Sequence, residues 1–267
     1  MGAKILKKGK GSPFSFSPFS FSPFFSIFAA NIHGRMNSYL SKFHKIILFE
    51  PNQFRFLKRD KAGKTISVAW SYSDPAFLPE YTPAFFRDSY PDEEIMVIVN
   101  THVPTLIPEE LYEEKVNLDY LKMQYPTYLI EKVLTDQLEN YMALYFITPD
   151  ADYALSAIEG SCKVTHFSTL LYDRAQEVCE QKELSNDLFC LHVHSGFADF
   201  FVKKEGRLHL LNRFVYHTVY DALYYMLNIF KQFNMAPETA IVLLSGNPEQ
   251  EFSQLLEEYF VNVIFIN

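Results

Sequence analysis

The chain has 267 residues, 48% of them hydrophobic, and its 26 Phe and 17 Tyr supply ample material for one large core or two smaller ones. Its formal net charge of −8 at pH 7 argues against nucleic-acid binding, because phosphate recognition needs concentrated Lys and Arg. No apolar run reaches the length of about 18 residues that a transmembrane helix needs, so no spanning segment is expected.

Residues 1–35 are set apart by their composition. Residues 11–26 repeat a Ser-Pro-Phe motif, and a proline at every fifth position prevents a continuous helix. We therefore predict that residues 1–35 form a disordered extension. One alternative is a secretory signal, because a basic start precedes an apolar stretch that ends near Ala30. Another is that the natural protein starts at Met36.

Three β-rich runs open the part of the chain that is expected to fold. They are residues 44–50, 53–58 and 65–72. The turn sequence Asp60–Gly63 favours an antiparallel hairpin between the second and third runs. A helix interrupted by two prolines is expected over 76–89. The run IMVIVN at 95–100 is typical of a strand that is buried on both faces.

The middle of the chain continues this alternation of helices and strands. Pro108 and the four glutamates after it have the composition of a helix start, with proline in the first turn and carboxylates near the positive end of the helix dipole. Further elements are strands at 131–138, 142–147 and 162–167 and helices over 149–159 and 168–181. Asp150 and Asp152 resemble a catalytic pair, but Pro149-Asp150 is better explained as the cap of the first of these helices.

The last eighty residues carry the clearest pattern. They predict strands at 188–195, 198–204 and 207–216, a helix over 218–233, a strand at 239–246, a helix over 251–260 and a strand at 261–266. Three antiparallel strands followed by helix, strand, helix and strand make one lobe of the fold of actin, Hsp70 and sugar kinases. Crossover helices after the third strand imply parallel pairing.

We therefore predict an α/β protein of the actin-like ATPase (RNase H-like) fold with two duplicated βββαβαβ lobes. The first lobe, with an inserted subdomain, is expected over residues 36–186 and the second over 187–267. The chain ends directly after a strand where this fold normally adds a closing helix, so a trimmed C-terminus is a further expectation.

A family of uncharacterised Bacteroidetes proteins resembles residues 36–267. The resemblance lies in the runs LHVHSGFADFFVKKEGRLHLLNRFVYHTVYDALYYMLNIFKQF, AIVLLSG and VNVIFIN. That family is a domain of unknown function with an actin-like ATPase fold, and the chain is also distantly similar to actin-like scaffold subunits of pilus assembly and type II secretion. The resemblance implies a fold and no activity. Its most specific positions are Asn212-Arg213-Phe214, Asp221 and Tyr224-Tyr225.

The first candidate site residue is Glu50. An actin-like ATPase needs an acidic residue at the end of the first strand of each lobe to organise Mg²⁺ and the attacking water. It also needs glycine in the next turn, so that backbone N–H groups can hold phosphates. Glu50 ends the first strand of the first lobe, but Pro51 removes a donor and no glycine follows.

The second lobe departs further from the ATPase pattern. His192 stands where the acidic residue is expected, and His194 stands where the first glycine of the turn is expected. The glycine pair expected on the adenosine side of the cleft is reduced to a single glycine. The remaining candidates for a nucleotide cleft are Ser195, Gly196, Ser245 and Gly246.

Metal and nucleophile sites are weakly indicated. His192 and His194 share one face of their strand, and His209 lies on a neighbouring strand, but spacing places no further ligand. We therefore expect ordinary hydrogen-bonded histidines and no metal site. Ser195 lacks the preceding glycine of a nucleophile elbow. Three irregularly spaced cysteines predict free thiols in the cytoplasm.

The expected function is that of a non-catalytic actin-like binding or scaffold protein in the cytoplasm, with no catalytic residue and no cofactor. Its partner would be an unidentified protein, and exposed residues such as Tyr220 or Tyr224 are candidates for the interface. A divergent ATPase or kinase is the first alternative, with ATP and Mg²⁺ held at Glu50 and the turn at 192–196. A membrane-associated assembly partner, reached through the basic N-terminal segment, is the second. The sequence predicts no oligomeric state.

Overall fold

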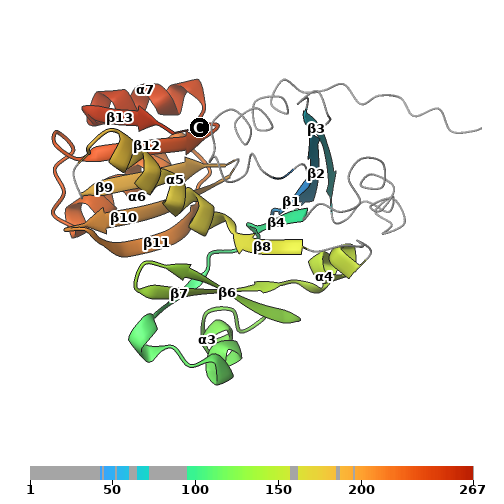
Figure 1. Cartoon of the computed structure of the whole chain (residues 1–267). Coiled ribbons are helices and arrows are strands. Elements are labelled where there is room, and N and C mark those ends of the chain that lie inside the picture. Colours follow the sequence, from blue (N-terminus) through green and yellow to red (C-terminus); the bar gives the residue numbers. More distant parts are fainter. Residues whose placement is uncertain are drawn as a thin grey trace, which may run out of the picture.

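The computed structural model describes residues 43, 45–51, 53–59, 65–71, 95–156, 162–184, 187–194 and 196–266. These residues form three β-sheets with associated helices (Figure 1). The predicted extension over 1–35, the Asp60–Gly63 turn and the helix over 76–89 lie outside them. No helix within the described part of the chain is long and apolar enough to cross a membrane.

The first sheet contains five strands in the order β3-β2-β1-β4-β8. They are β1 (Lys45–Phe49), β2 (Gln53–Arg59), β3 (Thr65–Ser71), β4 (Ile95–Val99) and β8 (Cys162–His166). β1 pairs antiparallel with β2 and parallel with β4. Every residue of β1 and β4 is buried, as expected for central strands that are covered on both faces.

The second sheet repeats this order as β11-β10-β9-β12-β13. Its strands are β9 (Leu188–Val193), β10 (Phe197–Lys204), β11 (Arg207–Val215), β12 (Ile241–Gly246) and β13 (Asn262–Phe265). α6 (Val219–Gln232) links β11 to β12, and α7 (Gln250–Tyr259) links β12 to β13. The repeated strand order confirms the predicted actin-like fold class, and the boundaries 36–186 and 187–267 stay a prediction.

The third, small sheet has the order β5-β7-β6 and is inserted between β4 and β8 of the first sheet. Its strands are β5 (Thr105–Pro108), β6 (Lys132–Leu138) and β7 (Tyr141–Ile147). The two strands predicted at 131–138 and 142–147 are confirmed. β5 was not predicted.

The prediction of a helix that starts at Pro108 is wrong. Pro108 ends β5 with an extended ψ of 134°, and the next N–H, that of Glu109, donates to Asn140 O at 2.8 Å, so sheet pairing continues past the proline. The glutamate-rich stretch then forms two short 3-10 turns, η2 (Glu109–Leu111) and η3 (Glu114–Val116). An α-helix begins only at α3 (Asn117–Gln124).

Helix α5 (Phe167–Gln181) lies between the first and second sheets. It starts one residue earlier than predicted, because the His166 ring accepts a hydrogen bond from Ser168 N and caps the helix. One core cluster contains Leu48 of the first sheet, Leu171 of α5 and Cys190 of the second sheet. Each large sheet therefore buries one face against the same helix.

The outer faces of the two large sheets have separate covers. α6 and α7 pack on the outer face of the second sheet. The outer face of the first sheet packs against Tyr145 of β7 and Ala151 of α4 (Pro149–Ser156). The small sheet is thus part of the core of the molecule.

Candidate functional site

Glu50 follows β1 and is paired within its own sheet. Its N–H donates to Gln53 O at 2.8 Å, which turns the chain into β2. The carboxylate is buried, and its Oε2 accepts hydrogen bonds from Gln53 Nε2 and Arg55 Nε, both at 2.8 Å. Arg55 therefore neutralises the one acidic cleft candidate of the first sheet.

A row of four polar residues crosses the second sheet. The strand register places His192 of β9 beside Asp199 of β10 and Ser245 of β12, and Asp199 beside Arg213 of β11. Register partners on adjacent strands share a face of the sheet, and the His192 ring lies 4.6 Å from that of Phe167 at the start of α5. The row therefore faces the first sheet and α5, which is the central helix of the molecule.

His192 is a buried, neutral histidine. Its Nδ1 lies 2.5 Å from Ser245 Oγ, and its Nε2 has no hydrogen-bond partner among the residues that the structure describes. Burial, together with the neighbouring His194 ring, lowers the pKa of His192 well below its usual range. The ring therefore carries no charge at neutral pH.

His194 and Gly196 shape the turn between β9 and β10. The His194 N–H donates to Phe197 O at 2.9 Å, and the two rings stack with their centroids 4.1 Å apart. Gly196 has a φ of +85°, in the left-handed region that favours glycine. Ser195 lies outside the described residues.

Asp199 and Arg213 form the charged centre of the row. Arg213 Nε lies 2.6 Å from Asp199 Oδ1, and its Nη2 lies 2.9 Å from Oδ2. Burial alone would raise the pKa of Asp199, but the hydrogen bond from His194 and the charge and hydrogen bonds of Arg213 hold it well below its usual range. The carboxylate is therefore ionised and paired.

The same arginine connects the second sheet to the first. Its Nη1 donates to Asn100 O at 3.0 Å, its Nη2 donates to Asn100 Oδ1, and Asn100 follows β4 directly. Asn100 Nδ2 also lies 3.4 Å from His194 Nε2. A continuous buried network, Asn100–Arg213–Asp199–His194, thus spans the two large sheets.

Gly246 ends β12 where it runs beside β9. Its φ is +86°, and a Cβ added there would lie 2.2 Å from Val193 O. Only glycine fits where the two strands approach each other this closely. Strand packing alone therefore explains why position 246 is a glycine. Its neighbour Ser245 is buried, and the Ser245 hydroxyl is hydrogen-bonded to His192.

Asn100, Asp199 and Arg213 were missed as site residues. The sequence signal that could have found them was Asp199, a carboxylate in the otherwise apolar run ADFF, because a buried charge needs a partner.

His209 does not join His192 and His194. It lies four residues from Arg213 along β11, where its exposed ring is 6.0 Å from that of Phe233. Among the described residues, no group of three His, Cys, Asp or Glu side chains is placed to hold a metal ion.

A second buried polar cluster joins β4, the small sheet and α5. His102 Nε2 accepts from Phe146 N at 3.2 Å, and His166 Nε2 lies 2.9 Å from His102 O. Asp136 of β6 accepts from the Tyr145 and Thr165 hydroxyls and from His166 N, at 2.8 to 2.9 Å. Burial lowers the pKa of both His102 and His166, and these contacts fix how the small sheet docks.

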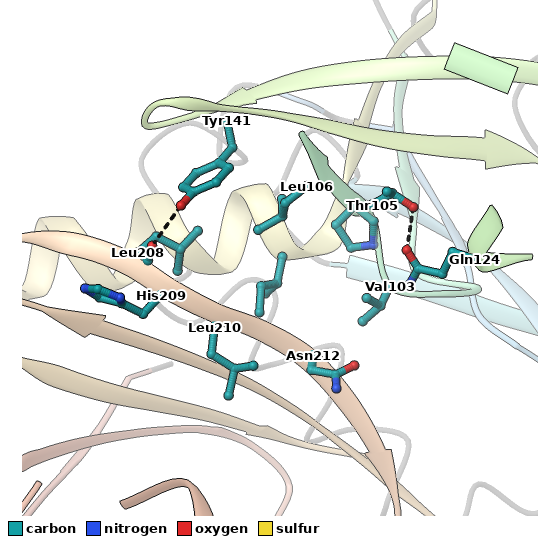
Figure 2. Close-up of a pocket in the computed structure, with 11 residues that line it drawn as sticks. Val103, Thr105, Leu106, Gln124, Tyr141, Leu208, His209, Leu210 and Asn212 are labelled. Atoms are coloured by element: carbon teal, nitrogen blue, oxygen red, sulfur yellow. Dashed lines mark hydrogen bonds between the residues drawn. The ribbon is translucent and has the colours of Figure 1, made fainter. Parts of the chain in front are cut away.

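A cavity of 310 Å³ lies between β5 of the small sheet and β11 of the second sheet (Figure 2). Its lining is Val103, Pro104, Thr105, Leu106, Gln124, Tyr141, Leu208, His209, Leu210, Leu211 and Asn212. Tyr141 OH donates to Leu208 O at 3.4 Å, and Leu208 N donates to Glu139 Oε2 at 2.9 Å. Side chains thus satisfy the outer backbone groups of β11 at Leu208, which disfavours the addition of a further strand there.

Solved structures similar to this chain include one protein with a described fold. The chain is similar to a protein with an actin-like ATPase fold and unknown function from Bacteroides thetaiotaomicron, at 19% identity and a TM-score of 0.64 over 87% of this chain and 95% of that chain. It is also similar to a chain of the PilM–PilN type IV pilus biogenesis complex, at 11% identity and a TM-score of 0.47 over 83% of this chain and 87% of that chain. At 19% identity, the likeness to the Bacteroides thetaiotaomicron protein shows the fold alone.

No curated protein matches the chain. The family model of DUF3822, described as a protein of unknown function, matches residues 37–263. Since this match covers most of the sequence, and the two large sheets share the strand order of an actin-like protein, the chain belongs to the DUF3822 family and has the actin-like ATPase fold.

Proposed function

We propose that this protein is a non-catalytic binding or scaffold protein built on the actin-like fold, and that it binds no nucleotide. The observation that carries the proposal is the pairing of two buried carboxylates at the candidate cleft. Glu50 is bonded to Arg55, and Asp199, the cross-strand neighbour of His192, is bonded to Arg213.

Both pairings oppose the binding of Mg²⁺. Each carboxylate is already neutralised by an arginine, and the positive charge of that arginine repels a second cation beside it. His192 is buried and neutral, and Mg²⁺ prefers oxygen ligands. These features support binding or scaffolding in preference to hydrolysis.

A divergent ATPase or kinase is the competing function. The feature that favours it is Gly196, whose positive φ lies in the β9–β10 turn, where an actin-like ATPase holds phosphate. Glu50 would then organise the metal ion. A membrane-associated role through the basic N-terminal segment stays a prediction, because that segment lies outside the described residues.

Thermal unfolding of the full chain with and without ATP and Mg²⁺ tests the proposal. We expect the melting temperature to stay constant at millimolar nucleotide, with Mg²⁺ alone and Mg²⁺ with tripolyphosphate as references. A ligand specific for the folded state, at a hundred times its Kd, adds about 2.7 kcal/mol and raises Tm by several degrees. A rise specific to ATP would overturn the proposal, and loss of that rise in Glu50→Gln but not in Glu110→Gln would locate the site.

A further inference from the structure

Three exposed tyrosines gather on the helices that cover the second sheet. Tyr220 and Tyr224 lie one turn apart on α6, and Tyr259 ends α7, with 58%, 63% and 48% of their surfaces exposed. The opposite side of each helix is already buried in the core, at residues such as Met226 and Leu256. The tyrosines are therefore not needed to pack the helices, and we call them the tyrosine face.

Exposed acidic side chains lie on the same helices as the tyrosine face, and two of them, Glu251 and Glu258, are close to Tyr220. Four exposed glutamates lie on α7 or at its start: Glu249, Glu251, Glu257 and Glu258. α7 contains no Lys or Arg, and α6 contains only Lys231, in its last turn. A hydrogen bond to Glu251, with the nearby Glu258 and Tyr259, raises the pKa of Tyr220, which places side chains of the two helices side by side.

The negative charge of these glutamates indicates which class of molecule can bind to the tyrosine face. Anionic lipid surfaces and nucleic acids would be repelled by four glutamates, and so would the same face of a second copy, which carries identical charges. A cationic protein segment is attracted instead. Arg and Lys stack on tyrosine rings through cation–π contacts and pair with carboxylates, and Tyr is enriched at protein interfaces.

We propose that the tyrosine face docks a protein segment that bears Arg or Lys. The inference rests on the proposed binding function, for which it names the surface and the chemistry of the partner. The segment would place its cationic groups over Tyr220, Tyr224 and Tyr259 and against the glutamates of α7. Binding of this kind weakens as salt concentration rises.

The test is titration of the full chain into a fluorescein-labelled peptide, RRLGRRF, followed by fluorescence anisotropy. Replacement of two acids on the face, Glu251→Gln with Glu258→Gln, is expected to weaken binding about three- to tenfold. Tyr224→Ser with Tyr259→Ser should weaken it by a similar factor, because cation–π contacts are lost. All four side chains are exposed, so each variant should keep its melting temperature.

The matched control removes the same charge elsewhere, with Glu110→Gln and Glu114→Gln on the exposed turns η2 and η3. Equal weakening by this control would mean attraction to net charge alone and would overturn the proposal. Full binding by the double tyrosine variant would also overturn it, as would dimerisation in sedimentation that the tyrosine substitutions abolish. An ATP-dependent rise in Tm with an intact tyrosine face would instead overturn only the proposed lack of nucleotide binding.

Discussion

At the scale of single residues, the buried histidines are held neutral by their surroundings. His166 Nδ1 accepts from Ser168 N at 3.0 Å, so its Nε2 carries the proton that is donated to His102 O. Burial lowers the pKa of His166 to about 4, and burial together with the neighbouring His166 ring and the charge of Arg213 lowers that of His102 to about 2. Protonation of either ring therefore opposes folding.

These shifts predict loss of stability in mild acid. Above pH 6.5 both rings are neutral in the folded and unfolded chains, and stability is full. As pH falls below 6.5 the unfolded chain binds protons that the folded protein does not, so the free energy of unfolding decreases until about pH 4 for His166. His166 alone contributes a loss on the order of 3 kcal/mol over this window.

Urea unfolding between pH 7.5 and 4.5 measures this slope. His166→Asn keeps an acceptor for the helix cap but cannot titrate, so its slope should be shallower than that of the natural protein. His209→Gln changes an exposed ring and should leave the slope as it is. An unchanged slope in His166→Asn would assign the acid sensitivity to other groups.

At the scale of elements, two glycines with the same backbone conformation have different surroundings. Gly196 and Gly246 have φ values of +85° and +86°. An added Cβ meets nothing within 4 Å at Gly196, but lies 2.2 Å from Val193 O at Gly246. The parallel pair β9–β12 therefore depends on Gly246, whereas the β9–β10 turn needs only the backbone freedom of Gly196.

Alanine substitutions at Gly196 and Gly246 should separate two costs in stability: the strain of a left-handed backbone and the steric clash between neighbouring strands. Gly196→Ala is expected to cost about 1–2 kcal/mol, the price of the left-handed conformation. Gly246→Ala should cost more, because β9 and β12 must also move apart. Equal losses in urea unfolding would show that β12 accommodates a methyl group and would contradict the stated role of Gly246.

At the scale of the whole molecule, a few polar contacts set how the sheets meet. Arg213 of β11 reaches Asn100 after β4, and Glu139 in the β6–β7 turn lies 3.1 Å from Lys203 Nζ of β10. Tyr172 of α5 also bonds to Glu139. The small sheet is thus fixed to both the central helix and the second sheet.

A double-mutant cycle measures the link between the large sheets. Arg213→Ala leaves Asp199 buried without its cation and should cost about 3–5 kcal/mol, whereas Asn100→Ala should cost about 1–3 kcal/mol. Because both residues share one network, we expect a coupling energy of about 0.5–3 kcal/mol. Arg207→Ala, on the same strand but exposed, should show no coupling to Asn100→Ala. Additive losses for the first pair would mean that the contact contributes little.

The sequence by itself determined the strand and helix order of the second sheet, because alternating and helical periods are local properties of residues 188–266. It also located Glu50, His192 and His194 at strand ends. Only the tertiary structure decided their partners: Arg213 and Asn100 are 113 residues apart in the chain, and no local period encodes such a contact. The strand at Thr105–Pro108 was likewise decided by a partner elsewhere in the chain, because it pairs with residues 141–144 of β7 across the small sheet.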